Sequence, residues 1–357
     1  MQWNDLVKSE GSESGAFLQT LEWGAFQASI GRTVFYIASA NGQPQLIAEA
    51  ETRQAENIDG LALAILMPIS FNKKFLYIPR GPIGENTEPL IELAIKIARE
   101  QKAIFVKIES TIENRKLKIE NRKSFGLQPE KTVILDLTKD AKDLLAAMHT
   151  KTRYNIALAR RHNVRITKID PSTMPLFESL RAPLFEPEPQ SRRQSLERQD
   201  DVARQFDQWF HLMSMTARRD GFHAHEKEYY KKLLNINSNF KTALWLAFDG
   251  EDLLAGNLTG YFNNTVTYLH GASSNTKRNL MAPFLLHWEI ILDAQKNGFT
   301  AYDFWGIDSK KWPGLSRFKQ NFGNESTLRE VSYPKAIDIP LNKFWHFLYK
   351  LKKTLIH

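Results

Sequence analysis

The sequence predicts an α/β protein of two similar halves, each with a mixed sheet flanked by helices. Two stretches share one layout, namely residues 73–110 and 266–306. Each reads as strand, polar loop, helix and strand, in which a proline opens the helix. The length of 357 residues also suggests two domains, at roughly 100–200 residues per domain.

In the first stretch we expect a strand at Phe75–Pro79, a helix at about Glu88–Gln101 and a strand at Ile104–Ile108. Pro89 stands where a helix begins, because its fixed φ suits the first turn. The loop between the first strand and the helix, RGPIGENTE, is rich in proline and glycine.

In the second stretch we expect a strand at Val266–His270, a helix at about Pro283–Lys296 and a strand at Ala301–Phe304. The distance from the helix proline to the next strand is nearly the same in both stretches. One such unit per half predicts a duplicated fold. The alternative is chance, because these units are common in α/β proteins.

Acyltransferases of the N-acetyltransferase (GNAT) type carry such a unit. There, a glycine-rich loop before the helix offers backbone N–H groups to the pyrophosphate of coenzyme A. Here the second loop has no glycine between Gly271 and Gly298, and Asn279, Leu280 and Met281 would hinder close approach. We therefore expect tandem N-acetyltransferase-like domains that do not use coenzyme A as acyl donor.

The predicted first domain comprises residues 1–145 together with the C-terminal residues 330–357. The predicted second domain comprises residues 146–329 and contains a proline- and charge-rich insert at 181–205.

Composition narrows the functional classes. The absence of cysteine excludes disulfides and thiol catalysis, and we expect neither a metal site nor a cofactor. The net charge of +8 is compatible with an anionic partner without choosing one. The N-terminus has no signal peptide, and the longest apolar run, Leu61–Ile69, is too short to span a bilayer. We expect a soluble cytoplasmic protein.

Residues 141–161 predict a helix with a basic face. Its apolar stripe recurs at spacings of three and four, and the opposite face carries arginines. No acidic residue occurs from Lys151 to Arg165, which suits contact with a phosphate backbone. An ordinary solvated helix surface is the alternative, and the missing acidic partners weaken it. The stripe comprises Leu145, Met148, Thr152, Ile156 and Ala159, and the basic face comprises Lys151, Arg153, Arg160 and Arg161.

The segment 302–323, YDFWGIDSKKWPGLSRFKQNFG, combines basic and aromatic residues. We expect a buried strand at Tyr302–Ile307 and a loop at Asp308–Pro313. The following RFKQNFG would place Lys319 in a cleft, with Phe318 and Phe322 buried to fix its direction.

The C-terminal stretch 341–357 predicts an amphipathic helix. Two alternatives remain open: a helix packed on the first domain, or a helix lying on an anionic membrane surface. Its apolar face comprises Phe344, Phe347, Leu348, Leu351 and Leu355.

Four segments in combination resemble the FemABX family of aminoacyl-tRNA-dependent peptidyltransferases, over most of the chain. They are LQTLEWGAFQ (18–27), MHTKTRYNIALARRHNVRI (148–166), TARRDGFHAHEKEYYKKLL (216–234) and YDFWGI…GLSRFKQNFG (302–323). The resemblance implies tandem N-acetyltransferase-like domains, aminoacyl-tRNA as donor and a monomer. It implies a peptidoglycan precursor as acceptor, either lipid II or UDP-MurNAc-pentapeptide, in formation of the interpeptide bridge. It also gives the basic helix face a partner.

The resemblance also implies site residues. Lys319 resembles the family's active-site lysine, a cation that would stabilise the developing oxyanion. Glu109 matches an acidic position near that site and is a candidate general base. The alternatives are a surface lysine and a solvated strand end.

The substrate-binding positions depart from the family pattern. Gln27 and His225 stand where a lysine and an arginine often hold the precursor's diphosphate, whereas Tyr229 is retained. Tyr268 resembles a further precursor-contacting tyrosine, and Arg317 would serve either the tRNA end or packing. These departures favour the lipid-linked acceptor or another amine, and membrane association with it.

Two other functions compete with this one. The first is a coenzyme A-dependent N-acyltransferase, which the glycine-free loop disfavours. The second is a non-catalytic module that binds tRNA or a membrane. Sequence does not identify the transferred amino acid.

Overall fold

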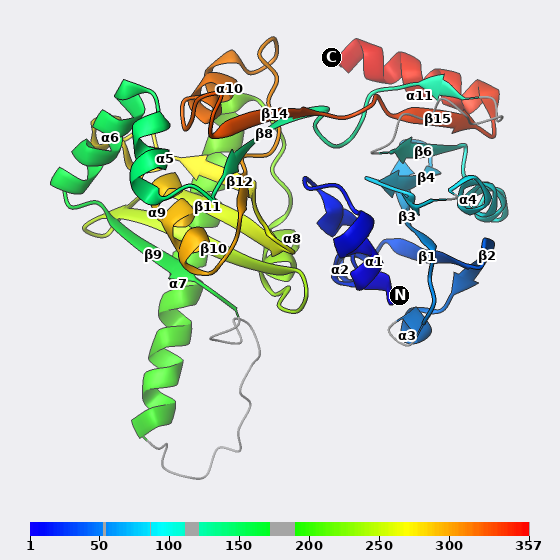
Figure 1. Cartoon of the computed structure of the whole chain (residues 1–357), viewed down its shortest axis with the longest axis horizontal. Coiled ribbons are helices and arrows are strands. Elements are labelled where there is room, and N and C mark those ends of the chain that lie inside the picture. The colour runs from blue at the N-terminus through cyan, green and yellow to red at the C-terminus, as the bar shows by residue number, and fades with distance from the viewer. Residues whose placement is uncertain (53–54, 86, 111–120, 172–189, 357) are drawn as a thin grey trace. The chain divides into compact units, whose positions relative to one another are not determined.

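The computed structural model describes the chain except for residues 53–54, 86, 111–120, 172–189 and 357, and it gives no side chains for 190–199 and 353–356. Residues 181–189 of the predicted insert therefore lie outside the described residues, whereas its residues 190–205 belong to the helix α7 (Gln190–Asp220). The chain divides into two compact units (Figure 1). Unit 1 comprises Met1–Thr132, Gly306–Asp308 and Glu330–His357, and unit 2 comprises Val133–Trp305 and Ser309–Arg329.

Unit 1 is built on a mixed sheet with the strand order β2-β1-β3-β4-β6-β15-β7, in which β5 pairs with β3. The pair β4–β6 is parallel, and the other pairs are antiparallel. The strands are β1 (Thr33–Ala40), β2 (Gln43–Ile47), β3 (Gly60–Ile69), β4 (Lys73–Pro79), β5 (Ile83–Gly84), β6 (Phe105–Glu109), β7 (Arg122–Lys123) and β15 (Ile337–Pro340).

Helices cover both faces of this sheet because its strands alternate two apolar sets of side chains. Leu76 of β4 and Val106 of β6 pack with α4 (Glu88–Glu100) on one face. Phe75 and Phe105 pack with α11 (Lys343–Ile356) on the other face. Four more helices complete the unit: α1 (Trp3–Glu10), η1 (Ala16–Gln19), α2 (Leu21–Ser29) and α3 (Glu49–Thr52).

Unit 2 is built on a second mixed sheet with the order β14-β8-β13-β12-β11-β10-β9. The pair β12–β13 is parallel, and the pairs from β9 to β12 and the pair β8–β13 are antiparallel. The strands are β8 (Lys131–Asp136), β9 (Arg165–Ile169), β10 (Lys241–Asp249), β11 (Asp252–Phe262), β12 (Thr265–Ser273), β13 (Ala301–Asp303) and β14 (Leu328–Ser332).

Helices of unit 2 pack on its antiparallel strands β10, β11 and β12. The helix α9 packs on β10 and β11, α6 packs on α9, and α7 packs on β11 and β12 (Figure 1). The helices are α5 (Ala141–Ala147), α6 (Thr150–Arg161), α7 (Gln190–Asp220), α8 (Lys227–Leu234), η2 (Arg278–Leu280), α9 (Ala282–Lys296) and α10 (Pro313–Gln320).

The two units repeat one topology, which confirms the predicted fold class. In unit 1, three neighbouring antiparallel strands (β1, β3, β4) are followed by α4 and the parallel strand β6. In unit 2, β10, β11 and β12 are followed by α9 and the parallel strand β13. The domain boundary predicted at residue 145 stays a prediction. The two compact units divide at Thr132.

The predicted continuous helix at 141–161 is wrong, because the chain breaks between α5 and α6. Met148 has extended backbone angles, and His149 caps α6 by accepting a hydrogen bond from the Lys151 amide at 3.2 Å. Thr152, Ile156 and Ala159 are buried as predicted. The break turns α5, so that Leu144 is buried in place of Leu145.

The predicted strand Tyr302–Ile307 is too long, because β13 ends at Asp303. The Asp303 carboxylate accepts a hydrogen bond from the Trp305 amide at 2.8 Å, and Trp305 adopts a positive φ of 55°. This local turn stops the strand. The first four residues of the segment RFKQNFG form the end of α10 (Pro313–Gln320).

Candidate active site

Lys319 is a buried amine on α10. Only 4% of the residue is exposed, although it follows the polar segment that starts α10. Its Nζ donates a hydrogen bond to the Trp305 carbonyl at 3.1 Å and lies 5.3 Å from the centre of the Tyr268 ring. The turn at Trp305 therefore supplies an acceptor for the amine, and the structure brings together two of the predicted site residues, Lys319 and Tyr268.

Aromatic side chains from three elements hold α10 in place. Phe322 is fully buried, and its ring centre lies 5.1 Å from that of Phe304 and 5.3 Å from that of Phe318. Phe284 of α9 contacts Phe318 at 5.0 Å between ring centres. This packing sets the direction of Lys319. Phe322 is buried as predicted, whereas Phe318 is only half-buried.

Burial makes Lys319 titrate near neutrality. The loss of water around Nζ lowers the pKa of Lys319 to about 7, and the charge of the buried Asp303 opposes this shift. Desolvation disfavours the charged form of an amine, so this direction is expected. The site can therefore present an ammonium to a developing oxyanion or a neutral amine to a proton, depending on pH.

His287 lies beneath this site and was not singled out by sequence reasoning. Its Nδ1 is 2.8 Å from the Tyr302 hydroxyl, and its Nε2 is 3.3 Å from Nδ2 of Asn257. The amide N–H donates, so Nε2 accepts and Nδ1 carries the proton. Burial and the charge of Lys319 lower the pKa of His287 to about 3, which keeps it neutral. The available signal was a single histidine on the buried side of α9.

Tyr268 lies against Gly271 of its own strand β12. A Cβ at Gly271 would overlap the Tyr268 hydroxyl and ring, so glycine leaves the space in which this ring lies. Burial raises the pKa of Tyr268, which keeps the phenol protonated at neutral pH. In the sequence, the run TYLHGASS contains both Tyr268 and Gly271.

His225 and Tyr229, which the sequence also selected, stack on each other at 3.8 Å between ring centres. The ring centre of His270 of β12 lies 6.0 Å from that of His225 and 5.2 Å from that of Tyr230. Desolvation, and then the charge of His225, lower the pKa of His270 to about 3. The cluster thus joins α8 and its preceding loop to the strand that carries Tyr268.

Glu109 lies in unit 1, at the end of β6, and is buried. Its carboxylate accepts hydrogen bonds from the Tyr77 hydroxyl at 2.6 Å and from the backbone amides of Leu127 and Gln128. Burial raises the pKa of Glu109 in spite of these bonds. The bonds hold the loop that enters β8, so Glu109 has a structural task whether or not it also acts as a base.

Gln27 also lies in unit 1, on α2, and is buried. Its side-chain oxygen accepts a hydrogen bond from the Arg32 guanidinium. A role in substrate binding stays a prediction for Gln27. Arg317 is exposed on α10, two residues before the buried Lys319, and its role likewise stays a prediction.

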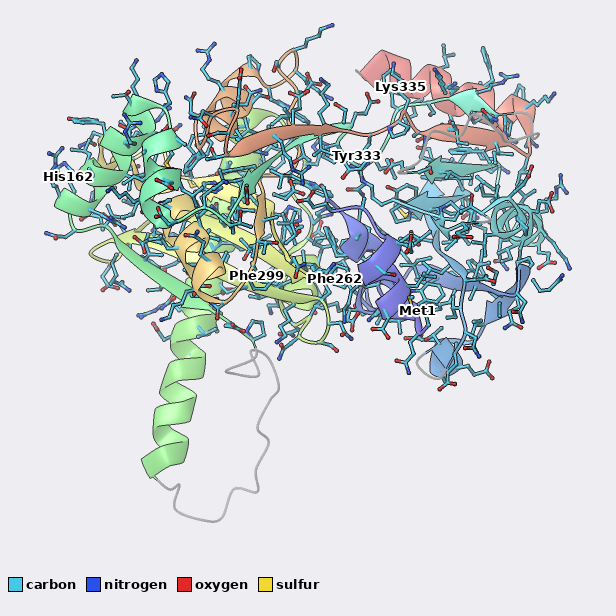
Figure 2. All side chains as sticks on the ribbon, viewed as in Figure 1. Met1, His162, Phe262, Phe299, Tyr333 and Lys335 are labelled. Atoms are coloured by element: carbon cyan, nitrogen blue, oxygen red, sulfur yellow. The ribbon has the colours of Figure 1, made fainter. Side chains whose placement is uncertain are left out.

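The predicted basic face is only partly available. Lys151 and Arg161 are exposed, whereas Arg153 donates to the carbonyls of Ala146 and Met148 at the end of α5. Arg160 forms a 2.8 Å ion pair with Glu289 of α9. The inference from absent acidic partners is therefore wrong for Arg160, because the partner comes from another helix. Figure 2 shows His162, which directly follows α6, at the outside of this unit.

In the described part of the chain, no three His, Asp or Glu side chains lie close enough together to hold a metal ion. None of the helices described combines the length and the apolar character needed to cross a bilayer.

Two units of one N-acetyltransferase-like topology make up the fold, and the second unit holds a buried lysine. The chain belongs to the FemAB family, whose model matches residues 121–248 and 244–330. This match confirms the resemblance seen in the sequence and the enzyme class, an aminoacyltransferase.

Relatives and solved structures agree with this assignment. A lipid II:glycine glycyltransferase of Staphylococcus epidermidis is 22% identical over 87% of this chain and 86% of its own. The enzyme of that name from Staphylococcus aureus (strain USA300) is 22% identical over 74% of this chain and 77% of its own. A crystal structure of FemX has a TM-score of 0.69 at 18% identity and covers 97% of both chains, which shows the shared fold.

Proposed function

We propose that this protein transfers an amino acid from aminoacyl-tRNA to the peptide amine of a peptidoglycan precursor, in formation of the interpeptide bridge. The acceptor is lipid II or its soluble form, UDP-MurNAc-pentapeptide. The protein acts in the cytoplasm, as a monomer, in peripheral contact with the inner face of the membrane. The observation that carries the proposal is the buried Lys319 beside Tyr268, in a family of aminoacyltransferases.

The reaction requires what this site can supply. The acceptor amine attacks the ester carbonyl carbon, so a C–N bond forms and the C–O bond to the ribose breaks, while a proton passes to the ribose oxygen. A positive charge close to the carbonyl stabilises the oxyanion of the intermediate. Lys319 is the candidate for this charge. Glu109 is the second candidate residue, as general base.

The loop before α9 argues against coenzyme A. Leu280 is buried in η2, and Lys277 forms 2.6 Å ion pairs with Asp249 and Asp252. The loop thus fills the space ahead of the helix with side chains and not with a glycine cradle. An aminoacyl-tRNA donor does not need that cradle.

Two features support tRNA as the donor. Lys151 and Arg161 are exposed on or beside α6, and the Arg161 guanidinium lies 5.7 Å from the centre of the exposed Tyr154 ring. Basic and aromatic side chains together suit nucleic acid, because phosphates attract the charge and bases stack on rings.

The acceptor is argued from the relatives, which carry the name lipid II:glycine glycyltransferase. His225 and Tyr229 offer a stacked platform next to the strand of Tyr268, where a precursor could bind. With His225 in place of a permanent cation, binding of a diphosphate at this platform would depend on imidazole protonation. That dependence favours lipid II, whose anchoring to a membrane lessens the need for a strong diphosphate contact.

The test is a transfer assay with total tRNA charged with labelled amino acids, supplied with lipid II and with UDP-MurNAc-pentapeptide in separate reactions. Label in either precursor supports the proposal and identifies both substrates. Lys319→Met should reduce transfer by roughly 100- to 1000-fold, whereas Lys96→Ala, which removes an exposed lysine of α4, should leave transfer unchanged.

Label in neither precursor, with tRNA retained on a filter, would refute the acceptor and favour another amine or a binding role. Failure to retain tRNA at low salt would refute the donor. Transfer of an acetyl group from coenzyme A to an amine would replace the proposal with the competing acyltransferase function.

A further inference from the structure

Four large apolar side chains are exposed on one surface of unit 1 and do not belong to the core on its sheet. Three lie on one face of α11, at spacings of three and four: Phe344 is 65%, Phe347 60% and Leu351 49% exposed. The fourth is Phe71, which is 78% exposed in the turn between β3 and β4. The Phe71 and Trp345 rings lie 6.1 Å apart between centres, so the turn and the helix form one surface, here called the α11 surface.

The helix cannot bury this face by rolling on the sheet. His346 of α11 contacts the Asp338 carboxylate at 2.9 Å, and Lys107 contacts the same carboxylate at 2.7 Å; all three side chains are buried. Tyr349 packs on Phe105 at 4.9 Å between ring centres. Trp345, His346 and Tyr349 of α11 thus pack inward, and Leu348 of the predicted apolar stripe is half-buried. Phe344, Phe347 and Leu351 of that stripe stay exposed.

Phe71 occupies a turn position at which phenylalanine is unfavourable. Both Phe71 and Asn72 have positive φ, of 61° and 52°, as in the mirror-image turns of β-hairpins. Such positions prefer asparagine or glycine, and a bulky side chain there is strained. Turn stability therefore does not explain the phenylalanine.

An apolar pocket of about 540 Å³ opens between the turn and the helix. Its walls include Ile69, Ile104 and Leu348, and its rim carries lysines. The Lys73 ammonium lies 4.6 Å from the centre of the Trp345 ring, and Lys352 donates a hydrogen bond to the Ser70 hydroxyl at 2.6 Å. The pocket thus joins an apolar interior to a positive edge.

The segment that carries α11 contains lysines and no acidic residue. From residue 341 to residue 357 the sequence contains no acidic residue, whereas lysines occur at 343, 350, 352 and 353. Lys73 and Lys74 add to these in β4. Exposed aromatic side chains beside lysines match the interface of an anionic bilayer, where rings enter the headgroup region and lysines meet phosphates. The aliphatic walls of the pocket at Ile69, Ile104 and Leu348 suit a lipid chain and offer a nucleic acid neither a charge nor a ring.

We propose that the α11 surface docks on a bilayer of anionic phospholipid, with Phe71, Phe344 and Phe347 in the headgroup region and a lipid chain in the adjoining pocket. This inference names the surface for the membrane contact in the proposed function, and docking itself does not depend on the transfer reaction. It would bring the enzyme to a lipid-linked acceptor.

The test is flotation of the full chain with vesicles of phosphatidylcholine alone and of phosphatidylcholine mixed with phosphatidylglycerol. The variant Phe71→Asn/Phe347→Ser removes two exposed rings, and asparagine suits the turn. We expect roughly tenfold weaker partitioning for this variant on the mixed vesicles. The matched control is Leu46→Ser, which changes an exposed side chain (53%) of β2 in the same unit. Control and wild type should float equally, and thermal unfolding should show all chains folded.

Charge is tested separately with Lys73→Gln/Lys352→Gln. This variant should lose the preference for phosphatidylglycerol vesicles and respond less to salt.

Wild-type protein that fails to float at low salt, or a double phenylalanine variant that floats like wild type, would overturn the proposal. Concentration-dependent dimerisation that the phenylalanine variant abolishes, without flotation, would identify a second copy as the occupant and also overturn it. Transfer to soluble UDP-MurNAc-pentapeptide separates the two proposals. If transfer persists without flotation, only docking fails; if flotation persists without any transfer, only the proposed reaction fails.

Discussion

Each unit buries a lysine at its sheet, and the two lysines have different surroundings. In unit 1, Lys107 of β6 lies 2.7 Å from the Asp338 carboxylate and donates to the Ser124 hydroxyl and the Phe125 carbonyl, at 2.8 and 2.9 Å. In unit 2, Lys319 of α10 contacts a backbone carbonyl and an aromatic ring, and burial lowers its pKa to about 7. The first arrangement fixes strands and a helix, whereas the second leaves an amine that titrates near neutrality.

The difference teaches that burial alone does not indicate a chemical role. Perturbed titration in a buried site marks a functional candidate, whereas structural networks can bury ionisable groups as well. The same contrast holds for the ends of the paired strands β6 and β13. Glu109 ends β6 within backbone hydrogen bonds, while β13 ends in the turn whose carbonyl contacts Lys319.

The largest expected effect comes from breaking the Lys107 network. Asp338→Ala should lower the free energy of unfolding by about 3–5 kcal/mol, because it leaves a buried ammonium without its carboxylate. Urea denaturation measures this change. Asp5→Ala is the control, since its 4.0 Å pair with Lys8 is exposed and should contribute less than about 1 kcal/mol. Equal losses in both variants would contradict a special role for the buried pair.

The pKa of Asp338 predicts how the stability that this network contributes changes at acid pH. Burial raises the pKa of Asp338, but the hydrogen bond from His346 and the Lys107 charge outweigh it and hold the pKa below its usual value. The network therefore stabilises fully above the unfolded value of about 3.9, and this stabilisation is lost as the pH falls through the folded pKa. Asp338→Ala should flatten this part of the profile.

Lys319→Met should reduce kcat for transfer by roughly 100- to 1000-fold, which corresponds to about 2.7–4 kcal/mol of lost oxyanion stabilisation. The fold should persist, because methionine has a similar length and volume and Asp303 keeps its hydrogen bond from the Trp305 amide. Single-turnover transfer and thermal unfolding measure the two effects. A variant that transfers like wild type would show that Lys319 is structural, as Lys107 is.

The pH profile sharpens the comparison of the lysines. The pKa of Lys319 is lowered to about 7, so the ammonium predominates below that pH and is lost above it. If the ammonium stabilises the oxyanion, kcat should fall as the pH rises through about 7. In Lys319→Arg, this decline in kcat should no longer occur near pH 7, because a guanidinium group stays protonated there. A kcat that instead rises through pH 7 would assign the neutral amine as a base.

The smallest expected effect concerns the basic residues of α6. Arg161→Ala should weaken tRNA binding by about 1 kcal/mol and reduce the salt slope by about one. Arg160→Ala should change binding less, because Glu289 already shares its charge at 2.8 Å. Filter binding at several salt concentrations measures both, and Lys96→Ala of α4 is the control. Equal effects of Arg160 and Arg161 would contradict the importance of the ion pair.

Much of the fold could be predicted from local signals. Proline at the start of α4 and α9 marked both helices within one or two residues, because its φ suits the first turn. The strands β4, β6 and β12 followed from their apolar runs. The break at Met148 and the turn at Trp305 escaped this reasoning. The first depends on a histidine cap and the second on a side chain that accepts a backbone hydrogen bond, and neither changes hydrophobic periodicity.

By itself, the sequence determined the duplicated α/β topology and the family, because both depend on the order and spacing of residues. The resemblance to that family then selected Lys319, Tyr268, His225 and Tyr229 as candidate site residues. Only the tertiary structure decided that His287 lies under Lys319, that Glu289 neutralises Arg160, and that α11 exposes Phe344, Phe347 and Leu351. Each of these results depends on contacts between residues far apart in the chain, and burial and charge pairing arise only when such residues meet.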